Sequence, residues 1–241
     1  LVANDDEGNK LPELDVTLIS TSELIPTFQR FIRQQTNLTD FVEQVDSYAL
    51  TPAELDFVRY IAGRSYDSID VFEVEFGLHA RWGELPYFRV TRGGVQYGVE
   101  HLGLGELASL FLYWATNRMR PGSILLADEP ESFLAAHSQG AIADLLAYTV
   151  AERNIACVIA SHSNDVVHNV PASRRLIATI GSHGLTIATA EDSPHHLSAL
   201  GVGRGTKLVA VSEDAAAAFF LREIITLGAP ALRNSIEVIW A

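Results

Sequence analysis

The sequence has one cysteine, one methionine and no long hydrophobic run. Cys157 alone excludes an internal disulfide and a cysteine-rich zinc site, and it is typical of a reducing compartment, so we expect a cytoplasmic protein. No apolar run reaches the ~18 residues of a membrane span, and no basic start leads into an apolar core. Neither membrane insertion nor secretion is therefore indicated. Because the sequence begins with Leu1 and closes on an apolar run at 235–241, we expect a segment of a longer protein.

Positive charge is also scarce. Lys and Arg number 17 against 30 Asp and Glu, which gives a formal net charge of −13 over 241 residues. Such a surface repels a polyanion, so any contact with nucleic acid must be local, and Arg89 and Arg92 are the candidate phosphate ligands. Because 48% of the residues are hydrophobic, the chain can bury a substantial core, which predicts a globular protein.

A phosphate-binding loop of the form Gly-x-x-x-x-Gly-Lys-Ser/Thr is missing from the sequence. The nearest match, at 201–207, has the wrong spacing and follows the acidic strand end described below instead of preceding it. These residues alone therefore do not predict a complete cradle for a nucleoside triphosphate.

Hydrophobic spacing predicts a mainly helical first part with a short strand at 16–19. Thr51-Pro52-Ala53-Glu54 combines an N-cap, a first-turn proline and a glutamate at the third helical position, which is a capping box. Helices are expected at 22–35, 38–48 and 51–62. Alternation predicts a strand at 68–76, followed by a hairpin at 87–97 around Gly93-Gly94.

From Gly105 onward, strands and helices alternate in an α/β pattern. A strand at 123–127, a helix at 136–153 and a strand at 156–160 form a crossover unit, so the two strands should be parallel neighbours. The other expected elements are helices at 106–119 and 215–227 and strands at 176–180, 185–190 and 208–211.

Asp128 and Glu129 follow the apolar strand residues 124–127. Open α/β sheets bind ligands at the carboxyl edge of their parallel strands. Adjacent carboxylates there can divide their roles, because one holds Mg²⁺ and the next accepts a proton from an attacking water. The alternative is a strand that simply leaves the sheet through an acidic turn.

Two further patterns flank these acids. His162 lies between two serines after the next expected strand, where an imidazole could hydrogen-bond a terminal phosphate; a lone histidine there is otherwise a surface or capping residue. Upstream, the glycine-interrupted loop at 101–106 opens a helix and offers backbone N–H groups to an anion.

In this order, the three motifs resemble the second half of an ABC-type ATPase head, with 131–139 in its dimer-facing region. The resemblance implies ATP as the nucleotide, with Gly103, Gly105 and Glu106 as nucleotide-binding residues, Asp128 as the Mg²⁺ ligand, and Glu129 and His162 as catalytic residues. The departure is Gly103, which stands where a serine usually contacts the γ-phosphate, so hydrolysis could be slow.

A narrower resemblance is to the OLD-family ATP-dependent endonucleases, in which an ABC ATPase precedes a Toprim nuclease domain. The residues that carry it lie at 87–95, 103–106, 128–131 and 207–214. It implies that Glu213, with Asp214 beside it, helps to bind catalytic Mg²⁺ or Mn²⁺, although this pair could also be an ordinary helix cap. The Asp-x-Asp of a complete Toprim domain is missing from these residues.

The implied organisation has three parts: a helical arm region at 1–86, half of an ATPase head with a mainly parallel sheet and flanking helices at 87–205, and the start of a Toprim α/β domain at 206–241. The implied partners are a second copy of the protein, joined through the heads, and DNA, with no membrane; several OLD-family members act in defence against phage. Three alternatives stay open. They are a sensor or scaffold ATPase whose nuclease effector is another protein, a degenerate head that only binds partners, and a DNA-repair ATPase.

Overall fold

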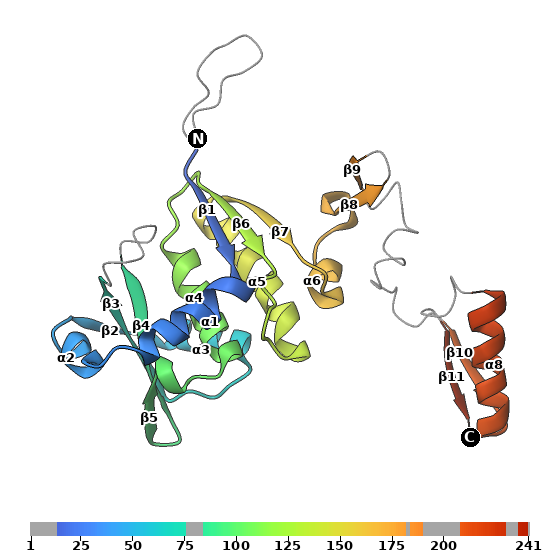
Figure 1. Ribbon diagram of the computed structural model, residues 1–241, viewed down its shortest axis with the longest axis horizontal. Coiled ribbons are helices and arrows are strands. Elements are labelled where there is room, and N and C mark those ends of the chain that lie inside the picture. The colour runs from blue at the N-terminus through green and yellow to red at the C-terminus, as the bar shows by residue number, and fades with distance from the viewer. Residues whose placement is uncertain (1–13, 76–83, 182–183, 190–207, 230–235, 241) are drawn as a thin grey trace, which may run out of the picture. The chain divides into compact units, whose positions relative to one another are not determined.

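The computed structural model describes residues 14–75, 84–181, 184–189, 208–229 and 236–240 (Figure 1). The chain divides into two compact units, Leu1–Ser161 and His162–Ala241, and each is described by itself. The polar start of the chain and the glycine-rich segment at 201–207 lie outside the described residues. No helix within the described ranges is long and apolar enough to cross a membrane.

The first unit contains the expected parallel sheet with flanking helices. Its strands are β1 (Val16–Ser20), β6 (Ile124–Asp128) and β7 (Ala156–Ala160), in the order β1-β6-β7. The predicted parallel pairing of β6 with β7 is confirmed, and helix α5 (Ala136–Arg153) makes the crossover. In this register Asp128 lies opposite both Ser20 and Ala160, so the three carboxyl ends meet at one edge.

A second, antiparallel sheet has the order β2-β3-β4-β5. Its strands are β2 (Ser47–Ala49), β3 (Ser68–Val74), β4 (Leu85–Arg92) and β5 (Val95–Gly98). The predicted hairpin is confirmed, and its turn requires glycine because Gly93 and Gly94 have φ of 58° and 75°. The helix predicted over 38–48 is wrong at its end. Helix α2 (Leu38–Glu43) stops early, because the following residues pair with β3 instead.

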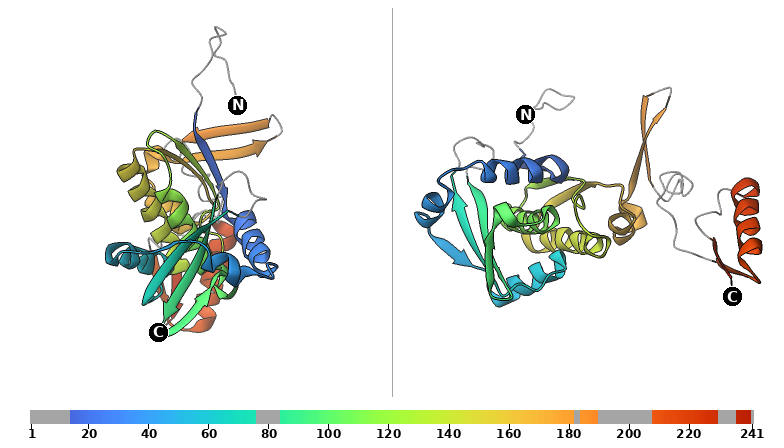
Figure 2. Two further views of the ribbon diagram at one scale, coloured as in Figure 1. Left: turned by 90° about the vertical axis from the view of Figure 1, so that its left-hand side faces the viewer. Right: turned by 60° about the horizontal axis from the view of Figure 1, so that its bottom comes forward.

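Helices α1 (Thr21–Arg33), α3 (Pro52–Ala62), α4 (Leu104–Asn117) and α5 contribute to the core of this unit together with strands β3 and β4 (Figure 2). Helix α4 contacts α1, α3, α5 and β4, and its residues 107–116 are all buried. A helix enclosed on every side must be apolar on every side, which explains why its sequence lacks an amphipathic stripe. Around α3, the predicted capping box at Thr51 is present.

The parallel sheet has one covered and one open face. Ile19, Leu125 and Ala127 are buried, whereas Leu18 is 51% exposed and Val158 is 59% exposed. Side chains alternate between the two faces of a strand, so the exposed residues belong to the face opposite the helices. Parallel sheets are normally covered on both faces. Within the described residues this sheet therefore presents an uncovered apolar surface.

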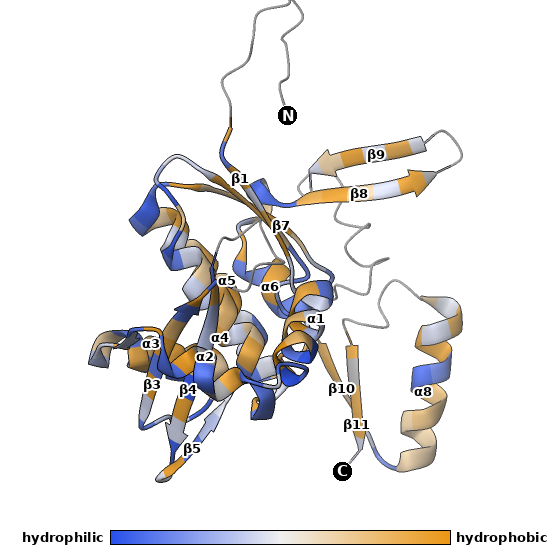
Figure 3. Cartoon of the chain, turned by 60° about the vertical axis from the view of Figure 1, so that its left-hand side comes forward, coloured by the Kyte–Doolittle hydropathy of each residue, from blue (hydrophilic) through white to orange (hydrophobic). Residues whose placement is uncertain are grey.

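The second unit contains short elements. Helix α6 (Asn164–Asn169) and the 3₁₀ turn η2 (Ala172–Arg174) precede the antiparallel pair β8 (Leu176–Gly181) and β9 (Gly184–Thr189). Strand β10 (Leu208–Ser212), helix α8 (Ala215–Gly228) and strand β11 (Ile236–Trp240) follow, with the two strands parallel. Figure 3 shows hydrophobic colouring along β8, β9 and much of α8. The expected strand at 208–211 and helix at 215–227 are thus present, and a second strand follows them.

Candidate functional site

The candidate site lies at the carboxyl edge of the parallel sheet. At the end of β1, the Ser20 hydroxyl donates a hydrogen bond of 3.0 Å to Oδ2 of Asp128 at the end of β6. Ser20 was not among the residues predicted from the sequence. Its pairing with Asp128 spans 108 residues, and the sequence signal was only a short strand ahead of a helix.

Glu129 is held in an uncommon backbone conformation immediately after β6. Its φ is 45°, in the left-handed region, which costs of order 1–2 kcal/mol for a residue with a Cβ atom. The Glu129 amide donates to the Ala160 carbonyl at 2.8 Å, and its Oε2 accepts from the Ser132 hydroxyl at 3.2 Å. The carboxylate is therefore presented by a constrained turn instead of a mobile loop.

The turn continues through residues 131–134 with a second left-handed residue, Phe133, at φ 69°. The Ser132 amide donates to the Glu129 carbonyl at 2.9 Å, and the Leu134 amide donates to the Glu131 carbonyl at 3.1 Å. Two consecutive reverse turns thus fold the chain back between β6 and α5, and we call residues 129–134 the acidic turn.

The glycine-interrupted loop lies between the 3₁₀ turn η1 (Val99–His101) and α4. The amide of Gly103 donates to Glu106 Oε2 at 3.1 Å, so the carboxylate caps the start of its own helix. Glu106 Oε1 accepts from the hydroxyls of Tyr66 and Tyr97 at 3.1 and 3.5 Å. Burial and the charge of Glu106 raise the pKa of Tyr66, so this tyrosine stays a neutral donor.

A buried glutamine supports the same loop from α1. Gln29 is 5% exposed, and its Nε2 donates to the carbonyls of Val99 and Leu102 at 3.0 and 2.6 Å. Because a buried amide without partners would cost free energy, these two bonds fix the path of the loop. Sequence patterns did not reveal this residue.

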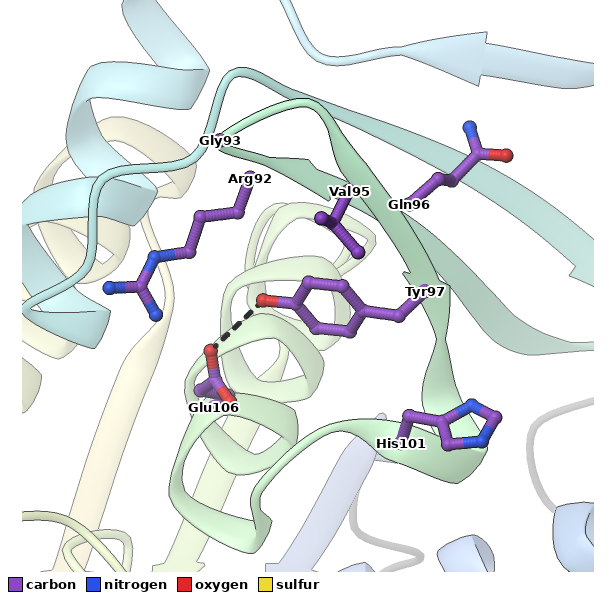
Figure 4. A pocket seen from close by; sticks show the side chains of 7 residues that line it. All are labelled: Arg92, Gly93, Val95, Gln96, Tyr97, His101 and Glu106. Atoms are coloured by element: carbon purple, nitrogen blue, oxygen red, sulfur yellow. Dashed lines mark hydrogen bonds between the residues drawn. The ribbon is translucent and has the colours of Figure 1, made fainter.

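An open pocket of about 700 Å³ borders the loop on the side of the β4–β5 hairpin (Figure 4). Arg92, Tyr97, His101 and Glu106 are among its lining residues, and Figure 4 shows the hydrogen bond between Tyr97 and Glu106. The His101 Nδ1 lies 3.2 Å from a carboxylate oxygen of Glu100. The pocket thus combines two basic side chains with a carboxylate that is already hydrogen-bonded.

The fold brings the glycine-interrupted loop and the acidic turn together. A Cβ atom added to Gly105 would lie 2.6 Å from the Phe133 carbonyl oxygen and 3.7 Å from the Leu134 Cα. The start of α4 therefore packs directly on the acidic turn, and only glycine permits this distance. The resemblance assigned this glycine to nucleotide binding, but its packing role follows from the structure alone.

Three other predicted residues, His162, Glu213 and Asp214, belong to the second unit. His162 is exposed and is the first residue of the second unit. Asp214 caps α8 by accepting from the Ala217 amide at 2.7 Å, and Glu213 is exposed. In the described part of the chain, no group of three or more His, Cys, Asp or Glu residues is suited to hold a metal ion. The roles of these three residues stay predictions.

No protein-family model matches the sequence, and no curated protein does either. Similar solved structures include the Smc head domain with a coiled coil and joint from Pyrococcus yayanosii, at 11% identity over 75% of this chain and 34% of that chain, with a TM-score of 0.43. The Smc head domain with an extended coiled coil bound to the C-terminal domain of ScpA, from Pyrococcus furiosus, has 12% identity over 75% of this chain and 42% of that one, with a TM-score of 0.38. The SMC head domain from Thermotoga maritima has 12% identity over 71% of this chain and 52% of that chain, with a TM-score of 0.38.

The chain thus spans about a third to a half of the length of these three structures. The function proposed below rests on the geometry of the residues themselves.

Proposed function

We propose that this chain forms the signature-to-switch half of an ABC-type ATPase head. The observation that carries the proposal is the pair Asp128 and Glu129 at the carboxyl edge of a parallel sheet, with Asp128 hydrogen-bonded by Ser20 and Glu129 held in a constrained turn. This edge is where open α/β sheets bind ligands, and the two carboxylates have different surroundings that suit different roles.

The oxygen atoms at this edge fit Mg²⁺. The Asp128 carboxylate is a hard donor that the Ser20 hydroxyl orients, and Mg²⁺ in phosphate-transfer sites takes one or two protein oxygens and completes its shell with phosphates and water. A cluster of three carboxylates is therefore not needed. When bound, Mg²⁺ neutralises charge on the transferred phosphoryl group.

Each protein residue then has a defined task. Glu129 would accept the proton of the water that attacks the γ-phosphate, and Asp128 would hold Mg²⁺. Backbone N–H groups at Gly103 and Gly105 face a nucleotide held by a second copy of the protein, and His162 hydrogen-bonds the terminal phosphate. A phosphate-binding loop is missing from these residues, and we propose that two heads enclose ATP between them in the cytoplasm.

For the C-terminal strand–helix–strand unit we propose the start of a Toprim nuclease domain, with Glu213 and Asp214 toward catalytic Mg²⁺ or Mn²⁺. Its support is the observed order β10-α8-β11 with the acidic pair between the first strand and the helix. ATP state would then gate DNA cleavage, as in an OLD-like defence nuclease. In the alternative, a sensor or scaffold head with a separate effector protein, the ATPase residues have the same roles and this chain has no nuclease site.

Two features of the loop before α4 favour a second candidate function. The Glu106 carboxylate already accepts the Gly103 amide at the start of α4, where a phosphate would compete with it, and Gly103 lacks a hydroxyl. Both features favour a degenerate head that binds partners and does not hydrolyse ATP. Measurement of ATP binding separates the two, because the degenerate head binds no nucleotide.

The test uses Glu129→Gln and Glu213→Gln in the protein that carries this chain. We expect E129Q to abolish ATP turnover, and E213Q to leave turnover intact while it abolishes cleavage of DNA. Undiminished turnover in E129Q would contradict the ATPase assignment. Undiminished cleavage in E213Q would contradict only the nuclease assignment.

A further inference from the structure

Glu131 is the only charged side chain that is buried within the described part of the chain, with 5% of its surface exposed. Burying a carboxylate is unfavourable unless hydrogen bonds replace its hydration. The other charged residues of the described ranges keep at least part of their side chains in solvent. A reason is therefore needed for an ionisable group at this position.

The hydrogen bonds of Glu131 are unequal. Its Oε1 accepts from the Ser161 hydroxyl at 2.5 Å, whereas its Oε2 is buried and has no hydrogen-bond partner among the described residues. An apolar residue of similar size would avoid the cost of that second oxygen. Stability alone therefore does not account for the carboxylate.

The hydrogen bond between Glu131 and Ser161 lies next to Glu129, the proposed general base. Next to the last paired residues of β6 and β7, the Glu129 amide donates to the Ala160 carbonyl, and the Glu131 carboxylate accepts from the Ser161 hydroxyl. One backbone bond and one side-chain bond thus join the acidic turn to the end of β7. The strained residue Glu129 thus belongs to a turn that is attached to β7 at both of these points.

We propose that Glu131 is a positioning residue: its buried carboxylate, bonded to Ser161, holds the acidic turn against the end of β7 and so fixes the direction of Glu129. The inference rests on the proposed role of Glu129. A left-handed backbone persists only where its surroundings over-determine it, and a charge-assisted hydrogen bond inside the protein is stronger than one in water. Loss of this bond lets the turn relax and misplaces the base.

The test compares Ser161→Ala with the matched variant Ser161→Thr, which keeps the hydroxyl. In the protein that carries this chain, we expect S161A to lower kcat for ATP hydrolysis about 10- to 100-fold, with KM changed less than about threefold, because a misplaced base weakens chemistry and not substrate binding. Amide hydrogen exchange over residues 129–134 should accelerate in S161A. S161T should restore both values.

Two variants of Glu131 keep the proposal testable if S161A does not fold. Glu131→Gln keeps an acceptor for Ser161 but loses the charge, so we expect kcat and amide exchange over residues 129–134 to fall between those of wild type and S161A. Glu131→Leu removes the acceptor and fills the volume. If E131L retains wild-type kcat, the carboxylate is only a packing element and the proposal is overturned.

Parallel measurement of E129Q separates this inference from the proposed function. If E129Q abolishes turnover while S161A leaves kcat unchanged, the positioning role is overturned and the ATPase assignment stands. If E129Q leaves turnover intact, the positioning role and the ATPase assignment both fail. If amide hydrogen exchange over residues 129–134 is unchanged in S161A, the bond between Glu131 and Ser161 does not hold the acidic turn, whatever the ATPase result.

Discussion

The hydroxyl of Ser20 donates to Oδ2 of Asp128 across the parallel pair β1–β6, at 3.0 Å. The two residues are 108 positions apart in sequence and opposite one another in the sheet. A hydrogen bond donated to a carboxylate oxygen fixes the orientation of the group. On the proposed assignment of Asp128 as a metal ligand, Ser20 orients the carboxylate that would hold the metal.

Removal of the Ser20 hydroxyl should raise the Mg²⁺ concentration that ATP turnover requires. For Ser20→Ala we expect the Mg²⁺ concentration for half-maximal ATP turnover to rise about 10-fold, as expected for loss of a supporting contact to a metal ligand. Ser20→Thr keeps the donor and should stay within about threefold of wild type. A Mg²⁺ titration of turnover gives both values. An unchanged half-maximal concentration in S20A would show that Ser20 does not support Asp128.

Gly105 should tolerate no side chain. The Cβ of Gly105→Ala would meet the Phe133 carbonyl at 2.6 Å, so the acidic turn must shift, and we expect a loss of about 1–3 kcal/mol in the free energy of unfolding. Gly103→Ala is the matched control, because its Cβ would meet only the flexible Glu106 carboxylate, at 3.3 Å. Urea denaturation should place G103A within about 0.5 kcal/mol of wild type. Equal effects of the two variants would contradict the packing described for α4.

The capping box of α3 gives a prediction about stability alone. The Thr51 hydroxyl accepts the Glu54 amide, and Glu54 Oε2 accepts the Thr51 amide at 2.8 Å. Thr51→Ala should lower the free energy of unfolding by about 1 kcal/mol, whereas Thr51→Ser should lose only a few tenths. Thermal and urea unfolding measure the difference. ATP turnover should not change in either variant, because α3 contributes no residue to the carboxyl edge.

The predicted pH dependence of stability comes from Glu73. Burial raises the pKa of Glu73, but hydrogen bonds donated by Trp114 and Arg118 outweigh it and leave the pKa below its ordinary value of 4.5. A carboxyl whose pKa is lower in the folded state adds stability above its unfolded pKa, and this contribution disappears as the pH falls through the folded value.

Glu73→Gln should therefore be less stable than wild type at about pH 7, and the difference should shrink below about pH 4. Glu75→Gln is the matched control, since Glu75 is exposed at the end of the same strand. Urea unfolding at the two pH values measures the difference. A gap between E73Q and wild type that stays constant with pH would contradict the role of Glu73.

Local patterns in the sequence were sufficient for most elements. The Gly93-Gly94 hairpin, the capping box at Thr51 and the parallel crossover through α5 all depend on residues close together in the chain, and all three are observed. The predicted helix over 38–48 was too long, because pairing with β3 decides the conformation of residues 47–49. Propensity gives way to such tertiary pairing.

The candidate site was only partly predictable for the same reason. Asp128 and Glu129 were visible as acids at a strand end, which is a local signal. Ser20, Gln29 and the bond from Ser161 to Glu131 act through contacts between distant segments, and no spacing in the sequence marks them. The glycine at 105 was identified by its motif, but its close approach to Phe133 required the fold.

The ATPase assignment is tested most directly by ATP turnover and ATP binding in Glu129→Gln, measured in the protein that carries this chain. Glu152→Gln on the exposed side of α5 is the control for the same change of charge. We predict that E129Q binds ATP within about threefold of wild-type affinity and hydrolyses it at least about 100-fold more slowly, while E152Q behaves as wild type. Turnover in E129Q equal to that of wild type would contradict the account.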